Sequence, residues 1–133
     1  MNCKNNSAQS SENHSEKPIL PAKEILGNPK YRAISFGGYR HQSREIQPSI
    51  EDLKEDMLMM HAMGIRIIRT YNVYLPHASN VLKAITALKA EHPDFEMYVM
   101  LGAWIDCLNA WTDLPPNHFE ESEANAGEIA RAA

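Results

Sequence analysis

Aromatic and polar side chains that could bind a sugar follow three apolar segments of the chain. The set comprises Tyr39, Arg40, Arg69, Tyr71, Asn72 and Trp104. Aromatic rings stack on the apolar face of a pyranose, while Arg and Asn side chains donate hydrogen bonds to its hydroxyls. This combination predicts a carbohydrate site. The alternative, that Tyr71 and Trp104 only complete a hydrophobic core, remains open from composition alone.

Among these residues, Arg69 has the most specific expected position, because it lies within a predicted strand. Alternation along a strand places residues 65, 67, 69 and 71 on one face. If that face is the interior of a barrel, the guanidinium needs carboxylate partners there, and the three expected strands contain no inward acid at that depth. The alternative is an outward Arg69 paired with a carboxylate on a helix.

The remaining reactive side chains predict no metal site and no cofactor. The six histidines show neither an HExxH motif nor a short paired spacing. The methionines within residues 57–63 recur at helical spacing, which favours a core over a soft-metal site. Cys107 has no histidine in a recognisable relation to it, so we expect a half-buried free thiol. Asp106 is the acid best placed for chemistry, because it follows the third apolar segment.

The elements that position these residues alternate between strand and helix. Strands are predicted over residues 32–39, 65–71 and 95–101, and helices over 21–27, 49–63, 78–91 and 119–132. A βαβαβα order with a repeat of roughly 30 residues implies an α/β fold with parallel strands.

Two parallel architectures are compatible with this order. A doubly wound dinucleotide-binding domain would require GxGxxG after the first strand, whereas this chain has Phe36-Gly-Gly-Tyr39. A (β/α)8 TIM barrel fits better, and its eight units take roughly 250 residues. Residues 19–133 supply three units, so we expect the N-terminal part of a longer, incomplete barrel domain.

Residues 1–18 predict a disordered polar tail or tether, because four Asn and four Ser leave almost no apolar surface to bury. Cys3 within this tail is a candidate lipidation site, since it resembles the junction after a lipoprotein signal. Either translation starts upstream and the protein is an envelope or extracellular lipoprotein, or Cys3 is an ordinary tail residue and the protein is cytoplasmic.

Charge and hydropathy exclude two classes of partner. The 133 residues carry a net charge of −4 without basic blocks, which argues against nucleic-acid binding. No apolar stretch approaches the roughly 18–20 residues of a membrane span, so no transmembrane segment is expected.

Three segments together resemble the first three strands of the bacterial branch of glycoside hydrolase family 17. They are Ala33-Ile-Ser-Phe-Gly-Gly-Tyr-Arg40, Gly64-Ile-Arg-Ile-Ile-Arg-Thr-Tyr-Asn72 and Met97-Tyr-Val-Met-Leu-Gly-Ala-Trp-Ile105. That family comprises (β/α)8 enzymes that act on β-1,3-glucans by retaining hydrolysis or glucanosyl transfer. The resemblance spans about residues 20–133, and its most specific parts are Arg69-Thr-Tyr71 and Leu101-Gly-Ala-Trp104.

The resemblance implies a role for each candidate residue. Tyr71 would border the subsite of the sugar whose bond is cut, and Arg69 would support the catalytic carboxylates beneath it. The cleft would be lined by Tyr39, Arg40, Asn72 and Trp104.

The family's general acid is a Glu after Asn at the end of strand four, and its nucleophile is a Glu at the end of strand seven. Neither motif is expected within this chain. The resemblance therefore implies the inactive N-terminal part of an enzyme whose substrate is a β-glucan or oligosaccharide. A noncatalytic carbohydrate-binding protein or truncated pseudo-enzyme is the alternative.

Overall fold

A computed structural model describes residues 20–133 of the chain. The predicted tail over residues 1–18, with Cys3, lies outside the described residues. In chain order the elements are α1 (Ala22–Ile25), β1 (Arg32–Ser35), α2 (Ile50–Ala62), β2 (Ile65–Arg69), α3 (His77–Glu91), β3 (Tyr98–Met100), β4 (Cys107–Leu108), β5 (Asn117–Glu121) and α4 (Ala124–Ala132).

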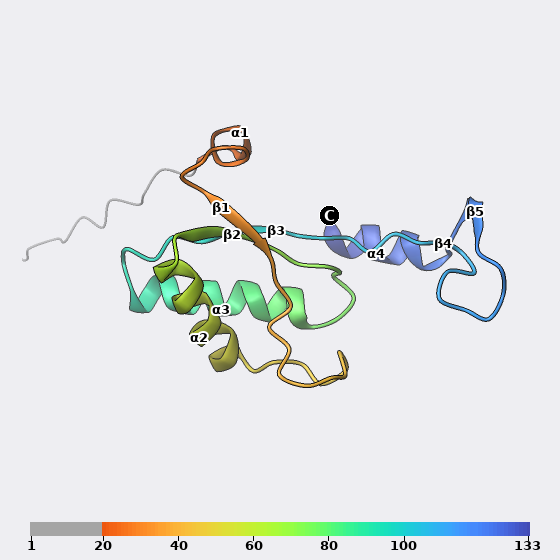
Figure 1. The fold of residues 1–133 in the computed structure, drawn as a ribbon, viewed down its shortest axis with the longest axis horizontal. Coiled ribbons are helices and arrows are strands. Elements are labelled where there is room, and N and C mark those ends of the chain that lie inside the picture. Colours follow the sequence, from red (N-terminus) through yellow and green to blue (C-terminus); the bar gives the residue numbers. More distant parts are fainter. Residues whose placement is uncertain (1–19) are drawn as a thin grey trace, which may run out of the picture.

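Strands β1, β2 and β3 form one parallel sheet in that order, with α2 and α3 on the same side of it (Figure 1). The α/β class and the parallel pairing of the three expected strands are therefore confirmed. The (β/α)8 closure stays a prediction, because a barrel needs further strands to complete it.

The register of the sheet places one row of side chains on the face that α2 and α3 cover and a second row, here called the open row, on the opposite face. Ile68 pairs with Ile34 and Val99, and both Ile68 and Val99 pack in the hydrophobic core. Arg69, one residue further on, pairs with Ser35 and Met100. Because successive side chains point to opposite faces, Arg69 faces away from α2 and α3.

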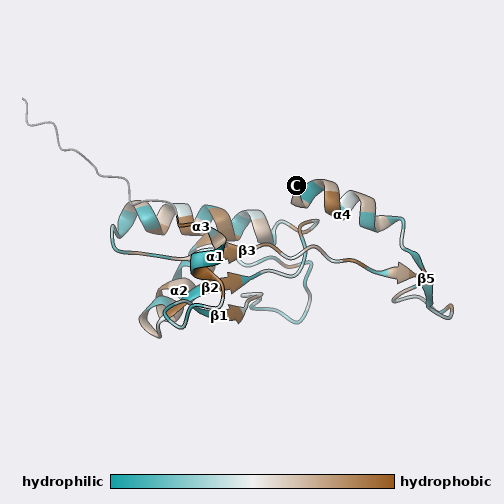
Figure 2. Ribbon diagram, turned by 90° about the horizontal axis from the view of Figure 1, so that it is seen from above, coloured by the Kyte–Doolittle hydropathy of each residue, from teal (hydrophilic) through white to brown (hydrophobic). Residues whose placement is uncertain are grey.

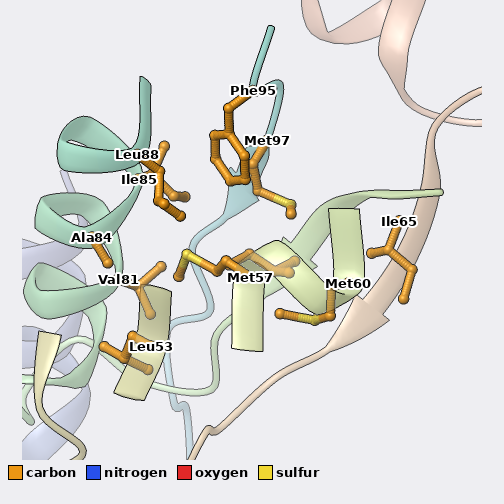
Figure 3. Packing of buried hydrophobic residues seen from close by; sticks show 11 residues of the cluster. Leu53, Met57, Met60, Ile65, Val81, Ala84, Ile85, Leu88, Phe95 and Met97 are labelled. Atoms are coloured by element: carbon orange, nitrogen blue, oxygen red, sulfur yellow. The ribbon is translucent and has the colours of Figure 1, made fainter. Parts of the chain in front are cut away.

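The hydrophobic core fills the space between the sheet and the two helices (Figure 3). It is built from Leu53, Met57, Met60, Ile65, Ile68, Val81, Ala84, Ile85, Leu88, Phe95 and Met97. Met63 and Leu82 stand at helical spacing with these core residues, but their side chains are exposed. Met63 is the C-terminal cap of α2, and Leu82 lies 44% exposed beside Val81, rotated away from the core.

Helix α2 begins with a capping box formed by Ser49 and Asp52, at the start of the helix predicted over residues 49–63. The Asp52 backbone N–H donates to Ser49 Oγ at 3.1 Å, and the Ser49 backbone N–H donates to Asp52 Oδ2 at 3.0 Å. Gly64 follows the helix with a φ of 82°, which allows the sharp turn into β2.

The helix predicted over residues 119–132 is wrong at its start. Residues 117–121 are strand β5, which pairs antiparallel with β4, and the Phe119 side chain is 99% exposed. The Ser122 backbone N–H donates to the Asp106 carbonyl at 3.0 Å and closes this hairpin, so α4 begins only at Ala124. Within residues 20–133 no helix has both the length and the apolar character that a bilayer span demands.

Candidate functional site

The loops after β2 and β3 run in direct contact beyond the sheet. The Gly102 backbone N–H donates to Thr70 Oγ1 at 3.1 Å, and the Thr70 backbone N–H donates to the Met100 carbonyl at 3.1 Å. A Cβ atom on Gly102 would lie 2.2 Å from the Thr70 carbonyl oxygen, so only glycine permits this approach. The two most specific segments of the sequence, around Thr70 and Gly102, are therefore neighbours in space.

The first cavity at this edge, here named the Arg69 cavity, has a volume of about 290 Å³. It is lined by Arg69, Thr70, Tyr71, Gly102, Ala103, Trp104, Ile105 and Asp106. Arg69 Cζ lies 5.7 Å from the centroid of the Tyr71 ring, a cation–π arrangement. No carboxylate within residues 20–133 pairs with Arg69, and the side chain faces away from the helices. The part of the chain that the structure describes contains no pair of an outward Arg69 with a helix carboxylate.

A second cavity, the Tyr39 cavity, has a volume of about 300 Å³ and is lined by Gly37, Tyr39, Arg44, Tyr71 and Asn72. The Tyr39 ring stacks on His77, with centroids 5.4 Å apart and planes at 26°. Burial lowers the pKa of His77, although a hydrogen bond with the Gly37 backbone partly opposes the shift. The imidazole is therefore neutral at pH 7. It packs against the Tyr39 ring as an uncharged surface and fixes the position of that ring.

Asn72 closes the turn that follows β2. Its Oδ1 atom accepts a hydrogen bond from the Leu75 backbone N–H at 3.2 Å, and the side chain is buried. Asn72 lines both the Tyr39 cavity and the larger cavity beside it. The Asn72 amide thus stabilises the loop after β2 and also places a polar group in the walls of both cavities.

This larger third cavity, the Trp111 cavity, has a volume of about 820 Å³. It is lined by Arg44, Asn72, Tyr74, Trp104, Asp106, Trp111, Ala124, Asn125, Glu128 and Arg131. Asp106 joins its two indoles: Oδ2 accepts from Trp104 Nε1 at 2.8 Å, and Oδ1 accepts from Trp111 Nε1 at 3.2 Å. The Trp104 and Trp111 rings lie 6.2 Å apart at 48°.

Helix α4 is held beside this cavity by two buried polar residues, Asn125 and Glu128. Asn125 Oδ1 accepts from the Asp106 backbone N–H at 3.0 Å, and its Nδ2 donates to the Asp106 carbonyl at 2.9 Å. Glu128 Oε1 accepts from the backbone N–H groups of Val73 at 2.7 Å and Trp104 at 3.0 Å. One helix thereby ties together the loops after β2 and β3.

The carboxylate of Glu128 is ionised at neutral pH. Burial alone would raise the pKa of Glu128, but the backbone N–H groups of Trp104 and Val73 outweigh it, together with Arg131. Arg131 Nη2 lies 3.2 Å from Glu128 Oε2. The net effect lowers the pKa of Glu128 below its ordinary value. Both carboxylate oxygens of Glu128 have hydrogen-bond partners within the protein.

Arg40 lies elsewhere. Its guanidinium donates to both carboxylate oxygens of Asp56, at 2.7 and 2.9 Å, and to the Asp52 carbonyl at 3.2 Å. The hydrogen bond to Asp56 raises the pKa of Arg40, despite some desolvation. Arg40 lines none of the Arg69, Tyr39 and Trp111 cavities, so the structure does not bring it together with the other candidates.

Sequence reasoning missed His77, Asn125 and Glu128. The signal for the last two was their i, i+3 spacing, which places two polar side chains on the same face of a helix. Cys107 is half-buried and unpaired within the described chain, as expected. No group of three His, Cys, Asp or Glu side chains in residues 20–133 could hold a metal ion.

Comparison with known proteins gives one informative similarity. No family model matches the chain, and no curated protein matches it. The structure is similar to the crystal structure of an endo-laminarinase from Formosa Hel1_33_131, with a TM-score of 0.80 and 69% sequence identity. The similarity covers 85% of this chain and 29% of the laminarinase chain, so the chain spans less than a third of that protein.

Proposed function

We propose that this chain is part of a glycoside hydrolase that acts on β-1,3-glucan. The observation that carries the proposal is the 69% identity, over 85% of this chain, to an endo-laminarinase, since laminarin is a β-1,3-glucan. The site agrees with it, because adjoining cavities at the ends of parallel strands combine aromatic rings with polar side chains.

The finer assignment in this proposal is to glycoside hydrolase family 17. In it, β1 to β3 are the first strands of a (β/α)8 barrel, and the open row of Ser35, Arg69 and Met100 faces the barrel interior. Active sites of such barrels lie at the carboxyl ends of the strands, where the Arg69 cavity is found. The reaction is retaining hydrolysis or glucanosyl transfer.

Five of the six sequence candidates keep a proposed substrate-binding role. Tyr71 borders the sugar whose bond is cut, and Arg69, within cation–π distance of it, supports the catalytic carboxylates. Tyr39, Asn72 and Trp104 line the cleft. Arg40 is left out because Asp56 engages its guanidinium.

We propose further that the 133-residue chain alone does not hydrolyse glucan. Retaining hydrolysis needs two carboxyl groups about 5–5.5 Å apart, one protonated as acid and one ionised as nucleophile. The carboxylates that line the cavities are Asp106 and Glu128. Asp106 accepts from two indoles and Glu128 from two backbone N–H groups, so both already have structural partners.

The first experiment tests the substrate and the role of Arg69. The protein translated from the complete reading frame is assayed on laminarin and laminari-oligosaccharides, and release of new reducing ends is expected. Replacement Arg69→Leu should lower turnover and shift the acid limb of its pH profile, because a carboxylate that loses its cation gains a higher pKa. Failure of the complete protein to cut any β-1,3-glucan would overturn the proposal.

The second experiment tests where the catalytic groups lie. The purified 133-residue chain is incubated with laminari-oligosaccharides beside its Asp106→Asn and Glu128→Gln variants, and no turnover is expected from any of them. Turnover by the unmodified chain that disappears in either variant would place the catalytic carboxylates within this chain.

A further inference from the structure

We propose that Trp104 and Trp111, joined by Asp106, form a second sugar-binding platform that takes a glucose unit of the glucan beyond the Arg69 cavity. This inference rests on the proposed function for its substrate class. The sequence pattern assigns no binding role to Trp111 and suggests only an acid role for Asp106. Four observations about the Trp111 cavity carry the proposal.

The first observation is the conformation of Trp111. Its side chain is 83% exposed, and its backbone has a φ of 62°, in the left-handed region that bulky residues rarely adopt. Exposure of a large aromatic side chain and backbone strain both oppose folding locally. A tryptophan in this state contributes little to the hydrophobic core, so its ring remains available to a ligand.

The second observation is that the loop presenting Trp111 is internally braced. Asn109 also has a φ of 62°, and its carbonyl accepts from Thr112 Oγ1 at 2.9 Å. Asn109 Nδ2 donates to the Pro115 carbonyl at 3.2 Å. These bonds hold the ring in place before any ligand arrives, which lowers the entropy lost on binding.

The third observation is the role of Asp106 as a positioning residue. Each of its carboxylate oxygens accepts from one indole N–H, which sets the two rings at 48°. Its own backbone is fixed by Asn125 through two hydrogen bonds. The N–H edges of both indoles are thereby satisfied, and the 83% exposed Trp111 ring offers apolar surface for the face of a sugar.

The fourth observation is the chemistry of the cavity. Its volume of about 820 Å³ lies in the usual range for ligand sites, and Tyr74, Arg44 and Arg131 add hydrogen-bonding groups around the rings. Trp104 and Asp106 also line the Arg69 cavity, so the two cavities adjoin. One oligosaccharide can therefore occupy both, and longer chains should gain affinity over short ones.

Calorimetric titration of the 133-residue chain with laminaritriose and laminarihexaose tests the platform. Replacement Trp111→Ala should weaken laminarihexaose binding about tenfold, and Trp111→Phe should restore much of it, because the ring is retained. The matched control is Phe119→Ala, which removes a 99% exposed ring that lines no cavity described above and should leave affinity unchanged. Circular dichroism of each variant establishes that it is folded.

The variant Asp106→Asn tests whether Asp106 positions the two indole rings or only stabilises the fold. The amide oxygen can still accept from one indole, so one of the two indole N–H resonances should shift while the other stays, and laminarihexaose affinity should fall. Unchanged affinity in both Trp111→Ala and Asp106→Asn would overturn the platform.

The platform and the proposed function can fail separately. Hydrolysis of laminarin by the complete protein, together with wild-type affinity in Trp111→Ala, would refute the platform alone. Binding of a different glucan through Trp111, without laminarin cleavage by the complete protein, would refute the function alone.

Discussion

Helices α3 and α4 bury opposite kinds of side chain. Helix α3 buries Val81, Ala84 and Leu88 against the core, whereas α4 buries Asn125 and Glu128 and leaves its Ile129 54% exposed. We call β1 to β3 with α2 and α3 the apolar region, and β4, β5 and α4 the C-terminal region. Figure 2 shows brown, hydrophobic stretches in the three strands of the apolar region.

The difference between the regions lies in the forces that hold them. Apolar burial is nondirectional and scales with area, so it sets the stability of the sheet and its two helices. Hydrogen bonds are directional, and the side chains of Asn125 and Glu128 accept them from the backbone N–H groups of Asp106, Val73 and Trp104, in the loops that line the cavities. The apolar region therefore stabilises the fold, and the C-terminal region positions the site.

The largest predicted effect is on the apolar region. Replacement Leu88→Ala should lower the free energy of unfolding by about 2–5 kcal/mol, because it leaves a cavity at a fully buried position. Urea unfolding followed by circular dichroism measures it. Leu82→Ala on the same helix is the control, and it should cost much less because Leu82 is half exposed. Equal costs for the two variants would mean that α3 does not pack as described.

The next largest effect is on the C-terminal region. Replacement Glu128→Ala should cost about 1–3 kcal/mol locally, since two buried N–H groups lose their acceptor. Hydrogen exchange should accelerate at the amides of Val73 and Trp104 and stay unchanged at Ile68. The control Ile129→Ala should alter neither set. Faster exchange throughout the sheet would contradict the separation of the two regions.

The apolar region could be predicted from the sequence because its patterns are local. Helical spacing of Leu53, Met57 and Met60 and the Ser49 capping box gave α2 its position, and β-branched runs indicated the strands. The limits of these elements were less accurate: β3 spans only Tyr98–Met100, where residues 95–101 were expected. Strand ends depend on pairing with β2, which no local pattern contains.

The C-terminal region could not be predicted in the same way. Residues 117–121 lack alternating apolar side chains, so nothing in them indicates a strand, and their structure comes from pairing with β4. Glu128 resembles a solvated helix residue until the loops of Val73 and Trp104 are placed beside it. The candidate site was predicted at the strand ends, but the polar residues that hold it were not.

The two regions should also differ in their response to acid. The pKa of Glu128 is lowered in the folded state, so its contribution is present above its ordinary pKa of 4.5 and is lost as the pH falls through the folded value. Burial lowers the pKa of His77 below its ordinary value of 6.5. The neutral imidazole therefore contributes its full share of folding free energy above pH 6.5, and this share is lost as the pH falls from 6.5 towards the folded pKa, so the loss begins at a higher pH than for Glu128.

Residue-resolved hydrogen exchange between pH 7 and pH 3, corrected for intrinsic rates, measures this difference. Amides around His77 should begin to lose protection below about pH 6.5, and those of Val73 and Trp104 only below about pH 4.5. Glu128→Gln should remove the lower transition and leave the upper one. A single transition shared by both sets of amides would show that the regions unfold together.

The smallest predicted effect concerns two arginines that the sequence alone does not separate. Arg40 and Arg44 both lie in the segment between β1 and α2, but Asp56 engages Arg40, whereas Arg44 lines the Tyr39 and Trp111 cavities. Replacement Arg40→Gln should lower stability modestly, because it removes a bidentate partner from the largely buried Asp56 side chain, and should leave laminarihexaose affinity unchanged. Arg44→Gln should weaken binding modestly, because it removes a cationic donor from two cavities. Calorimetry on the two variants gives the comparison, and a loss of affinity confined to Arg40→Gln would return Arg40 to the cleft.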